Sequence, residues 1–226
     1  MTDPQLFLLS LGYVIVVLAT AEFIRGRYQL PGDFTRKFVH IAIGTWSIPT
    51  FTLFTAVGWA VALPALFVGV NALSYKLKFF RAIEEEGGRN LGTILFPLAF
   101  AMLILIFWNS NVREAPMMGL MALAWGDAFA AIIGRRYGKM RYRIFGEERS
   151  LEGSFAMYIF SFLAGITVLS LRPLGLTPMY RSEVATVVAV GCTLIEAMAI
   201  RGTDNLFIPV GGAGIAWLLL QHHLSH

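Results

Sequence analysis

The sequence has little charge and a single cysteine, and both shortages limit what the protein can be. Asp, Glu, Lys and Arg make up 14% of the 226 residues, whereas 57% are hydrophobic. The mean hydropathy of +0.67 lies outside the range of ordinary soluble domains. Cys192, the only cysteine, provides neither a disulfide framework nor a thiolate zinc site. The composition therefore excludes a disulfide-rich or zinc-thiolate domain and predicts an integral membrane protein.

Long apolar runs recur along the chain and are separated by short loops. A helix that rises about 1.5 Å per residue needs roughly 20 residues to cross a hydrocarbon core about 30 Å thick. We expect spans at 5–24, 38–54, 56–74, 94–110, 115–134, 153–171, 184–200 and 206–222, the second and the last being the weakest. The prediction is an all-α, polytopic transmembrane bundle of seven or eight helices, with residues 1–226 forming one domain.

The basic residues alternate between the expected loops. The loops after the first, third, fifth and seventh spans hold four, four, six and one of the 18 Lys and Arg residues. The loops after the second, fourth and sixth spans hold none, one and two. The positive-inside rule then puts the N-terminus outside and the odd-numbered loops in the cytoplasm. The start lacks the positive region of a signal peptide, so we expect a retained first helix. No targeting motif indicates an organelle, so we expect a prokaryotic cell membrane. Basic residues in such short loops suit anionic headgroups or phosphates, and we expect no nucleic-acid partner.

One acidic residue, Asp127, lies inside the fifth apolar run. A charged side chain at the bilayer centre costs about 2.5–3.5 kcal/mol, so Asp127 needs a partner in the bundle interior, a water-filled cavity or a bound cation. Gly134 and Gly138 share its helical face. A basic cluster follows, made of Arg135, Arg136, Lys139, Arg141 and Arg143. These residues suit a polyphosphate with Mg²⁺, but a helix-packing face and a loop on anionic lipid explain them too.

Two further polar groups lie at predicted cytoplasmic helix ends. Asp204 and Asn205 would complete an oxygen-rich metal site, with an ordinary Asp-Asn turn as the alternative. Arg36, Lys37 and His40 fall within about one helical turn and would contact a headgroup or phosphate. His40 could then act as general base for a lipid hydroxyl. Membrane-surface anchoring explains this group equally well.

Other polar residues have local interpretations. Ser150 is expected to cap the following helix, with Glu152 near its positive N-terminus. Glu22, Asn71 and Glu196 interrupt apolar runs, and Glu196 is the deepest of the three. The acidic run at 84–90 is expected to form a solvated loop, with a substrate-contact loop as the alternative.

Three segments together resemble the membrane family of CTP-dependent polyprenol, phytol, dolichol and diacylglycerol kinases. They are RKFVHIAIG, GDAFAAIIGRRYGK with the following SLEGSFA, and TDNLFIPVGGA, and they span Arg36 to Ala213 in the family's order. In that family the middle segment is taken as the nucleotide-binding region. The resemblance implies this role for Asp127, Gly134, Arg135, Gly138, Lys139, Ser150, Glu152, Gly153 and Ser154. Arg149 stands where the family more often has lysine, which preserves charge but not a point-like phosphate contact.

The resemblance implies phosphoryl transfer from CTP, or another nucleoside triphosphate, to the hydroxyl of a membrane lipid alcohol. We expect Asp127 and Asp204 to bind Mg²⁺, and Arg135, Lys139 and Arg149 to hold the phosphates. Glu152 would orient a ligand or the metal, and either His40 or polarisation of the alcohol by the metal would supply the nucleophile on the cytoplasmic side. The lipid would contact Arg36, Lys37 and Asn71, and the nucleotide would contact Gly134, Gly138, Ser150, Gly153, Ser154 and Asn205.

Two alternatives stay open at this point, and the oligomeric state is undetermined. A phosphatidate cytidylyltransferase has a similar glycine-basic stretch and also uses CTP, but it would release pyrophosphate and a CDP-lipid. A small transporter would use the intramembrane acids as an ion path instead. The gathering of the strongest motifs on one predicted face of the membrane favours an enzyme over the transporter.

Overall fold

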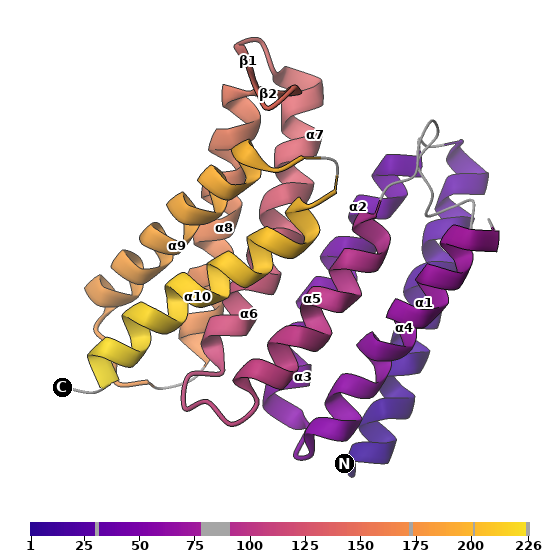
Figure 1. Ribbon diagram of the computed structural model, residues 1–226, viewed down its shortest axis with the longest axis vertical. Coiled ribbons are helices and arrows are strands. Elements are labelled where there is room, and N and C mark those ends of the chain that lie inside the picture. The colour runs from indigo at the N-terminus through magenta and orange to yellow at the C-terminus, as the bar shows by residue number, and fades with distance from the viewer. Residues whose placement is uncertain (30–31, 78–90, 172–173, 201, 225–226) are drawn as a thin grey trace.

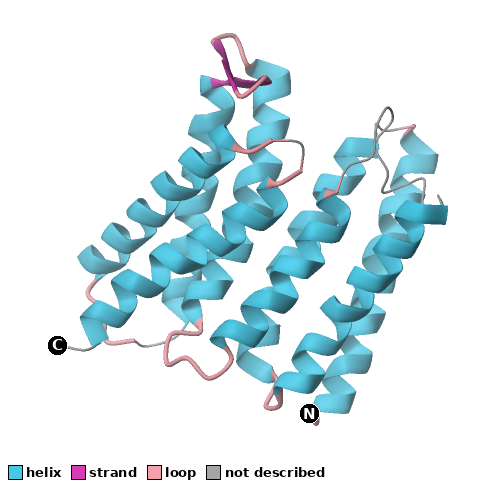
Figure 2. Cartoon of the chain, viewed as in Figure 1, coloured by secondary structure: helices cyan, strands magenta, loops and turns pink. Residues whose placement is uncertain are grey.

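The computed structural model describes residues 1–29, 32–77, 91–171, 174–200 and 202–224, and these are almost entirely helical (Figures 1 and 2). The predicted acidic loop at 84–90 lies outside the described residues. The helices are α1 (Asp3–Tyr28), α2 (Gly32–Thr45), α3 (Ser47–Leu53), α4 (Val57–Leu77), α5 (Gly92–Phe107), α6 (Glu114–Met121), α7 (Ala128–Tyr137), α8 (Leu151–Leu171), α9 (Pro178–Met198) and α10 (Asp204–Leu224). The all-α prediction is confirmed.

Length and composition separate these helices into two sets. Within the described residues, four helical stretches are long and apolar enough to cross a membrane: Asp3–Tyr28, Val57–Lys76, Glu114–Tyr137 and Leu151–Leu171. Helix α5 is apolar but has only 16 residues. Of the eight predicted spans, those at 38–54, 94–110, 184–200 and 206–222 are outside the set of four, and the two judged the weakest from the sequence are among them.

The predicted span at 38–54 is two helices, so the expectation of one continuous helix was wrong. Helix α2 ends at Thr45, and α3 begins at Ser47 with Pro49 in its first turn. Proline has no N–H to donate to the Thr45 carbonyl, and its ring crowds that carbonyl. The chain therefore breaks at Trp46.

The predicted span at 115–134 contains a π-helical segment, η1 (Ala122–Asp127), between α6 and α7. Such segments insert an extra residue into a helix and often lie at functional sites. This stretch is central to the molecule because it packs against α2, α8 and α10. Ala122, Leu123 and Ala124 are fully buried there, and Asp127 ends the segment.

A short β-hairpin interrupts the helices and was not predicted. Strands β1 (Arg141–Ile144) and β2 (Glu147–Ser150) pair antiparallel, with Arg141 opposite Ser150. The turn residues Phe145 and Gly146 both have positive φ, 49° and 88°, as a two-residue type I′ turn requires. The sequence lacks the Asn-Gly pair that usually signals this turn.

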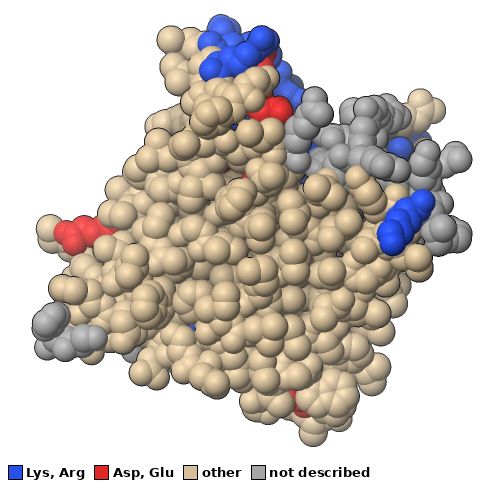
Figure 3. Space-filling view, viewed as in Figure 1, with Lys and Arg blue, Asp and Glu red and all other residues tan. Residues whose placement is uncertain are grey.

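The helices gather into two groups in Figure 1. Helices α6–α10 form one group and α1–α5 the other, and contacts of α2 with η1 and of α5 with α10 join them. The N-terminus and the end of α10 at Leu224 lie at the end of the bundle opposite the hairpin. Figure 3 shows Lys and Arg side chains around the hairpin, above a broad uncharged surface. On this face of the molecule, the Lys and Arg side chains gather mainly at the hairpin end.

Candidate active site

The partner that Asp127 needs is Lys37, which lies 90 residues away in sequence. Lys37 Nζ on α2 donates to Asp127 Oδ2, and both side chains are 8% exposed. A second contact joins the same elements, because Trp125 Nε1 in η1 donates to Thr45 Oγ1 in α2 at 2.9 Å. A buried carboxylate is tolerated where an opposite charge compensates it. The two groups of helices thus meet at a buried ion pair.

His40 lies one helical turn beyond Lys37 on α2 and is 7% exposed. Its ring stacks on Phe96 of α5, with ring centroids 4.9 Å apart and planes at 22°. His40 Nδ1 is buried, and no hydrogen-bond partner for it is present among the described residues. A buried polar atom without a partner is costly. Its position beside Lys37 and Asp127 makes it available for a bound group.

A second set of charges lies close to Asp127. Asp204, at the start of α10, is near enough for the two carboxylates to repel each other. Glu196 of α9 also interacts with both carboxylates. Arg149 Nε lies 2.8 Å from Glu196 Oε1 as an ion pair, although the bond is not aligned as a hydrogen bond. Three acids from three elements therefore lie within electrostatic range of one another, with Lys37 paired to Asp127 and Arg149 paired to Glu196.

The donors present suit a magnesium ion held mainly by its substrate. No group of three or more His, Cys, Asp and Glu side chains in the described part of the chain is arranged to hold a metal. Mg²⁺ is usually bound by one or two carboxylates together with phosphate oxygens and water. Asp127 and Asp204 provide two carboxylates, and Asn205 Oδ1 beside them is a buried acceptor without a described partner. This donor set fits Mg²⁺ without a closed protein cage.

The glycines of the middle segment bring α7 and α8 together. A Cβ on Gly138 would lie 2.2 Å from the Gly134 carbonyl oxygen and 2.7 Å from Ser150 Oγ. A Cβ on Gly153 would lie 3.1 Å from the Ala130 carbonyl oxygen. The helix-packing interpretation of these glycines therefore describes this structure. The predicted cap is confirmed, because Gly153 N donates to Ser150 Oγ at 3.1 Å.

Two other predicted site residues hold the base of the hairpin. Glu152 Oε1 accepts from the backbone N–H groups of Lys139 and Met140, at 3.0 and 3.3 Å. Tyr142 OH and Ser154 Oγ lie 2.6 Å apart. Both contacts fix the chain between α7 and α8. They leave Glu152 and Ser154 apart from the charges around Asp127.

The remaining predicted residues lie around these centres. The side chains of Arg135 and Lys139 are exposed near the end of α7, beside the hairpin. Asn71 of α4 donates through Nδ2 to the Thr93 carbonyl at 2.8 Å. The structure therefore brings together Lys37, His40, Arg149, Asp127, Asp204 and Asn205, whereas Glu152, Ser154, Arg135 and Lys139 lie at the hairpin.

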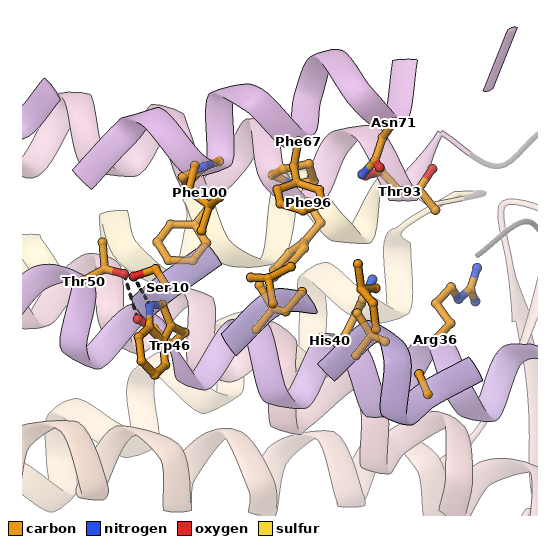
Figure 4. Close-up of a pocket in the computed structure, with 18 of the residues that line it drawn as sticks. Ser10, Arg36, His40, Trp46, Thr50, Phe67, Asn71, Thr93, Phe96 and Phe100 are labelled. Carbon is orange, nitrogen blue, oxygen red and sulfur yellow. Dashed lines mark hydrogen bonds between the residues drawn. The ribbon is translucent and has the colours of Figure 1, made fainter. Parts of the chain in front are cut away.

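A largely apolar cavity of about 460 Å³ lies among helices α1–α5, and it was not predicted. Figure 4 shows that Arg36, His40, Asn71 and Thr93 lie towards one end and Ser10, Trp46 and Thr50 at the other. Phe67 and Phe96 line the middle, and Phe100 lies above Ser10 and Trp46. His40 belongs both to this cavity and to the charged group around Asp127. The apolar cavity therefore adjoins the buried charges at His40.

Comparison with known proteins gives relatives along most of the chain. The chain is 34% identical over 210 residues to the phytol kinase of Synechocystis sp., covering 92% of this chain and 89% of the relative. A probable chloroplastic phytol kinase of Triticum aestivum is 27% identical over 82% of this chain and 67% of its own length. The dolichol kinase of Saccharomyces cerevisiae is 27% identical over 69% of this chain and 31% of its own length. No family model matches the chain, and no solved structure does so significantly.

Proposed function

This chain belongs to the family of membrane lipid-alcohol kinases that includes phytol and dolichol kinases, and we propose that it phosphorylates an isoprenoid alcohol with CTP and Mg²⁺. One observation carries the proposal: His40 lines an apolar cavity and also lies beside the Lys37–Asp127 ion pair. A lipid hydroxyl and a phosphate would meet at such a junction. The following steps assign the roles of the residues.

The lipid tail would occupy the cavity among α1–α5, whose walls are mainly aromatic and aliphatic. Each methylene group removed from water contributes about 0.8 kcal/mol. The hydroxyl would lie at the polar end, near Arg36, His40 and Asn71. This orientation brings the reacting oxygen of the alcohol to the buried charges.

The nucleotide would bind from the hairpin end of the molecule. Arg135 lies eight residues beyond Asp127, or about 12 Å along α7 at 1.5 Å per residue. A triphosphate is long enough to lie along such a stretch, with Arg135 and Lys139 near its outer part and Arg149 nearer Asp127. Gly134, Gly138, Ser150 and Gly153 would act by holding α7 against α8. The positions of the proposed nucleotide contacts therefore depend on the packing of α7 against α8.

Phosphoryl transfer of this kind depends on positioning and charge neutralisation. Mg²⁺ held by Asp127 and Asp204 would supply neutralising charge to the phosphates. Lys37 places a second cation at the junction with the cavity. His40 would accept the hydroxyl proton while the alcohol oxygen bonds to the γ-phosphorus. The bond from that phosphorus to the β,γ-bridging oxygen breaks, and CDP leaves.

The proposed orientation puts the hairpin and the nucleotide site in the cytoplasm. Basic side chains gather around the hairpin, whereas the N-terminus and the end of α10 lie at the opposite end of the bundle. Positively charged loops are retained on the cytoplasmic side, where nucleoside triphosphates are available. We therefore propose a multi-pass protein of the cell membrane with its N-terminus outside.

A labelling experiment tests this proposal. Purified protein in detergent would be incubated with Mg²⁺, an alcohol and CTP labelled at the γ- or the α-phosphate. We expect γ-label in a lipid monophosphate, and less product when ATP, GTP or UTP replaces CTP. Incorporation of α-label into a CDP-lipid from phosphatidic acid would instead establish cytidylyl transfer. Absence of any nucleotide-dependent lipid product would contradict the proposal.

A further inference from the structure

The side chain of Arg149 joins the hairpin to the end of α9. Arg149 lies in β2, opposite Tyr142 in β1. Its Nε lies 2.8 Å from Glu196 Oε1 as an ion pair, and its Nη2 donates to the Ala199 carbonyl at 3.4 Å. Glu196 and Ala199 are three residues apart, so both acceptors lie on the same face of the last turn of the helix. Two acceptors on α9 therefore fix the plane of the guanidinium group.

These two contacts occupy only one edge of the guanidinium group. Nε and Nη2 of Arg149 lie on the edge that faces α9. For the opposite edge, which Nη1 shares with the second N–H of Nη2, no hydrogen-bond partner is present in the part of the chain that the structure describes. The Arg149 side chain is 25% exposed, against 7% for Glu196. Such an edge can donate two parallel hydrogen bonds to a phosphate.

The Arg149–Glu196 pair lies beside the two carboxylates proposed to bind Mg²⁺. The charge of Arg149 acts on Asp204, and Glu196 lies within electrostatic range of both Asp127 and Asp204. Mg²⁺ bound by one or two carboxylates usually takes phosphate oxygens as further ligands. The phosphates of a nucleotide at these carboxylates would therefore lie close to Arg149.

We propose that Glu196 is a positioning residue for the nucleotide, because it holds the Arg149 guanidinium with its other edge towards the phosphates. This inference rests on the proposed function, and it gives a role to a buried acid that the proposed transfer does not use. A side chain that is fixed before binding loses less conformational freedom when the phosphate binds. Glu196 thus promotes the binding of an anion although it is an anion itself.

This role and simple electrostatics predict opposite effects of removing the Glu196 charge. Glu196→Gln keeps almost the same shape and removes a negative charge near the proposed phosphate site. A glutamate that acted only through repulsion would then give tighter CTP binding in the variant. We expect the Kd for CTP to rise about tenfold instead, because a neutral amide holds the guanidinium less firmly than a carboxylate does. KM for the alcohol should not change, since Glu196 lies outside the cavity lining.

A double-mutant cycle tests whether Glu196 acts through Arg149. Equilibrium dialysis of labelled CTP with Mg²⁺ in detergent would give the Kd for the wild type, both single variants and the double variant. We expect Arg149→Gln to raise the Kd about 30-fold. In that background, Glu196→Gln should change the Kd by less than about twofold.

Two further variants complete the experiment. Glu183→Gln is the matched control with an expected wild-type Kd, because Glu183 is an exposed glutamate on the same helix. Glu196→Asp replaces Glu196→Gln in the cycle if the latter does not fold. It keeps the charge but is one methylene group shorter, so electrostatics alone predicts no change, whereas the positioning role predicts weaker CTP binding.

The outcomes separate this inference from the proposed function. If the wild type binds no CTP, the proposed function is wrong and the inference fails with it. If the wild type phosphorylates an alcohol with CTP but the Glu196 variant binds CTP as tightly as Glu183→Gln does, or more tightly, the kinase stands and the inference fails. The inference also fails if the Glu196 substitution raises the Kd by the same factor with and without Arg149, because Glu196 would then act independently of that side chain.

Discussion

The two groups of helices differ in how closely they pack. Of the most apolar window in each span, 67% is buried in the α6–α7 stretch, against 22% in α1 and 17% in α4. A Cβ added to Gly12 or Gly69 meets nothing within 4 Å, whereas one on Gly119 would lie 2.1 Å from the Pro209 carbonyl oxygen. Buried charges need surroundings that hold them in place, and a lipid tail needs space. The close-packed group thus holds the acids, and the open group holds the cavity.

The largest expected effect comes from removing the charge at the centre of the close-packed group. Asp127→Asn keeps the shape of the side chain but removes a carboxylate proposed to stabilise charge during transfer. We expect kcat to fall by at least about 100-fold for every alcohol. Kinase assays should be accompanied by thermal melts, with Glu148→Gln as the control. A folded Asp127→Asn protein within a few-fold of wild-type activity would exclude this role.

The buried ion pair should make stability depend on both partners. Lys37→Met leaves Asp127 as an uncompensated buried charge, which typically costs about 3–5 kcal/mol. Combining Lys37→Met with Asp127→Asn should restore much of this loss, because neither charge then remains. Chemical denaturation of the two single variants and the double variant measures the coupling. Simple additivity of the two single effects would mean that the pair is not formed in solution.

Glycine substitutions test the difference in packing between the close-packed and the open group of helices. Gly119→Ala places a methyl group against backbone atoms of Pro209 and Ala213, and we expect a loss of about 1–3 kcal/mol. Gly69→Ala in α4 should be neutral or should stabilise the helix by up to about 1 kcal/mol. Thermal melts of the two variants in one detergent provide the comparison. Equal losses at both positions would show that the two groups pack alike.

The smallest effect is expected at the exposed hairpin. Hydrogen bonding to Arg141, together with its charge, lowers the pKa of Glu148 below its usual value of 4.5. The pair therefore stays charged from pH 7 down to that value, and it weakens only as the pH falls further. Because exposed ion pairs contribute little, Glu148→Gln should leave the melting temperature unchanged at pH 7. A clear drop would show that the hairpin is part of the stable core.

The sequence predicted the helices well and the contacts between them poorly. The intramembrane position of Asp127 predicted that it needs a partner, but no local pattern identified Lys37. Glu196 stood out for the same reason, and its contact with Arg149 appears only in three dimensions. The cavity could not be predicted from the sequence, because its apolar lining has the same composition as a surface that faces lipid. The break at Trp46 was readable in principle from Pro49.

The account assigns alcohol binding to the open group of helices and phosphoryl transfer to the close-packed group. This assignment can be tested by measuring kcat, KM for the alcohol and KM for CTP in Ala60→Leu and Asp127→Asn side by side. Ala60 of α4 lines the cavity and is 3% exposed, so Ala60→Leu would fill part of it. We expect Ala60→Leu to change the preference among alcohols while KM for CTP stays at the wild-type value. Asp127→Asn should lower kcat by a similar factor for every alcohol. A change in alcohol preference with unaltered kcat in Asp127→Asn would contradict the account.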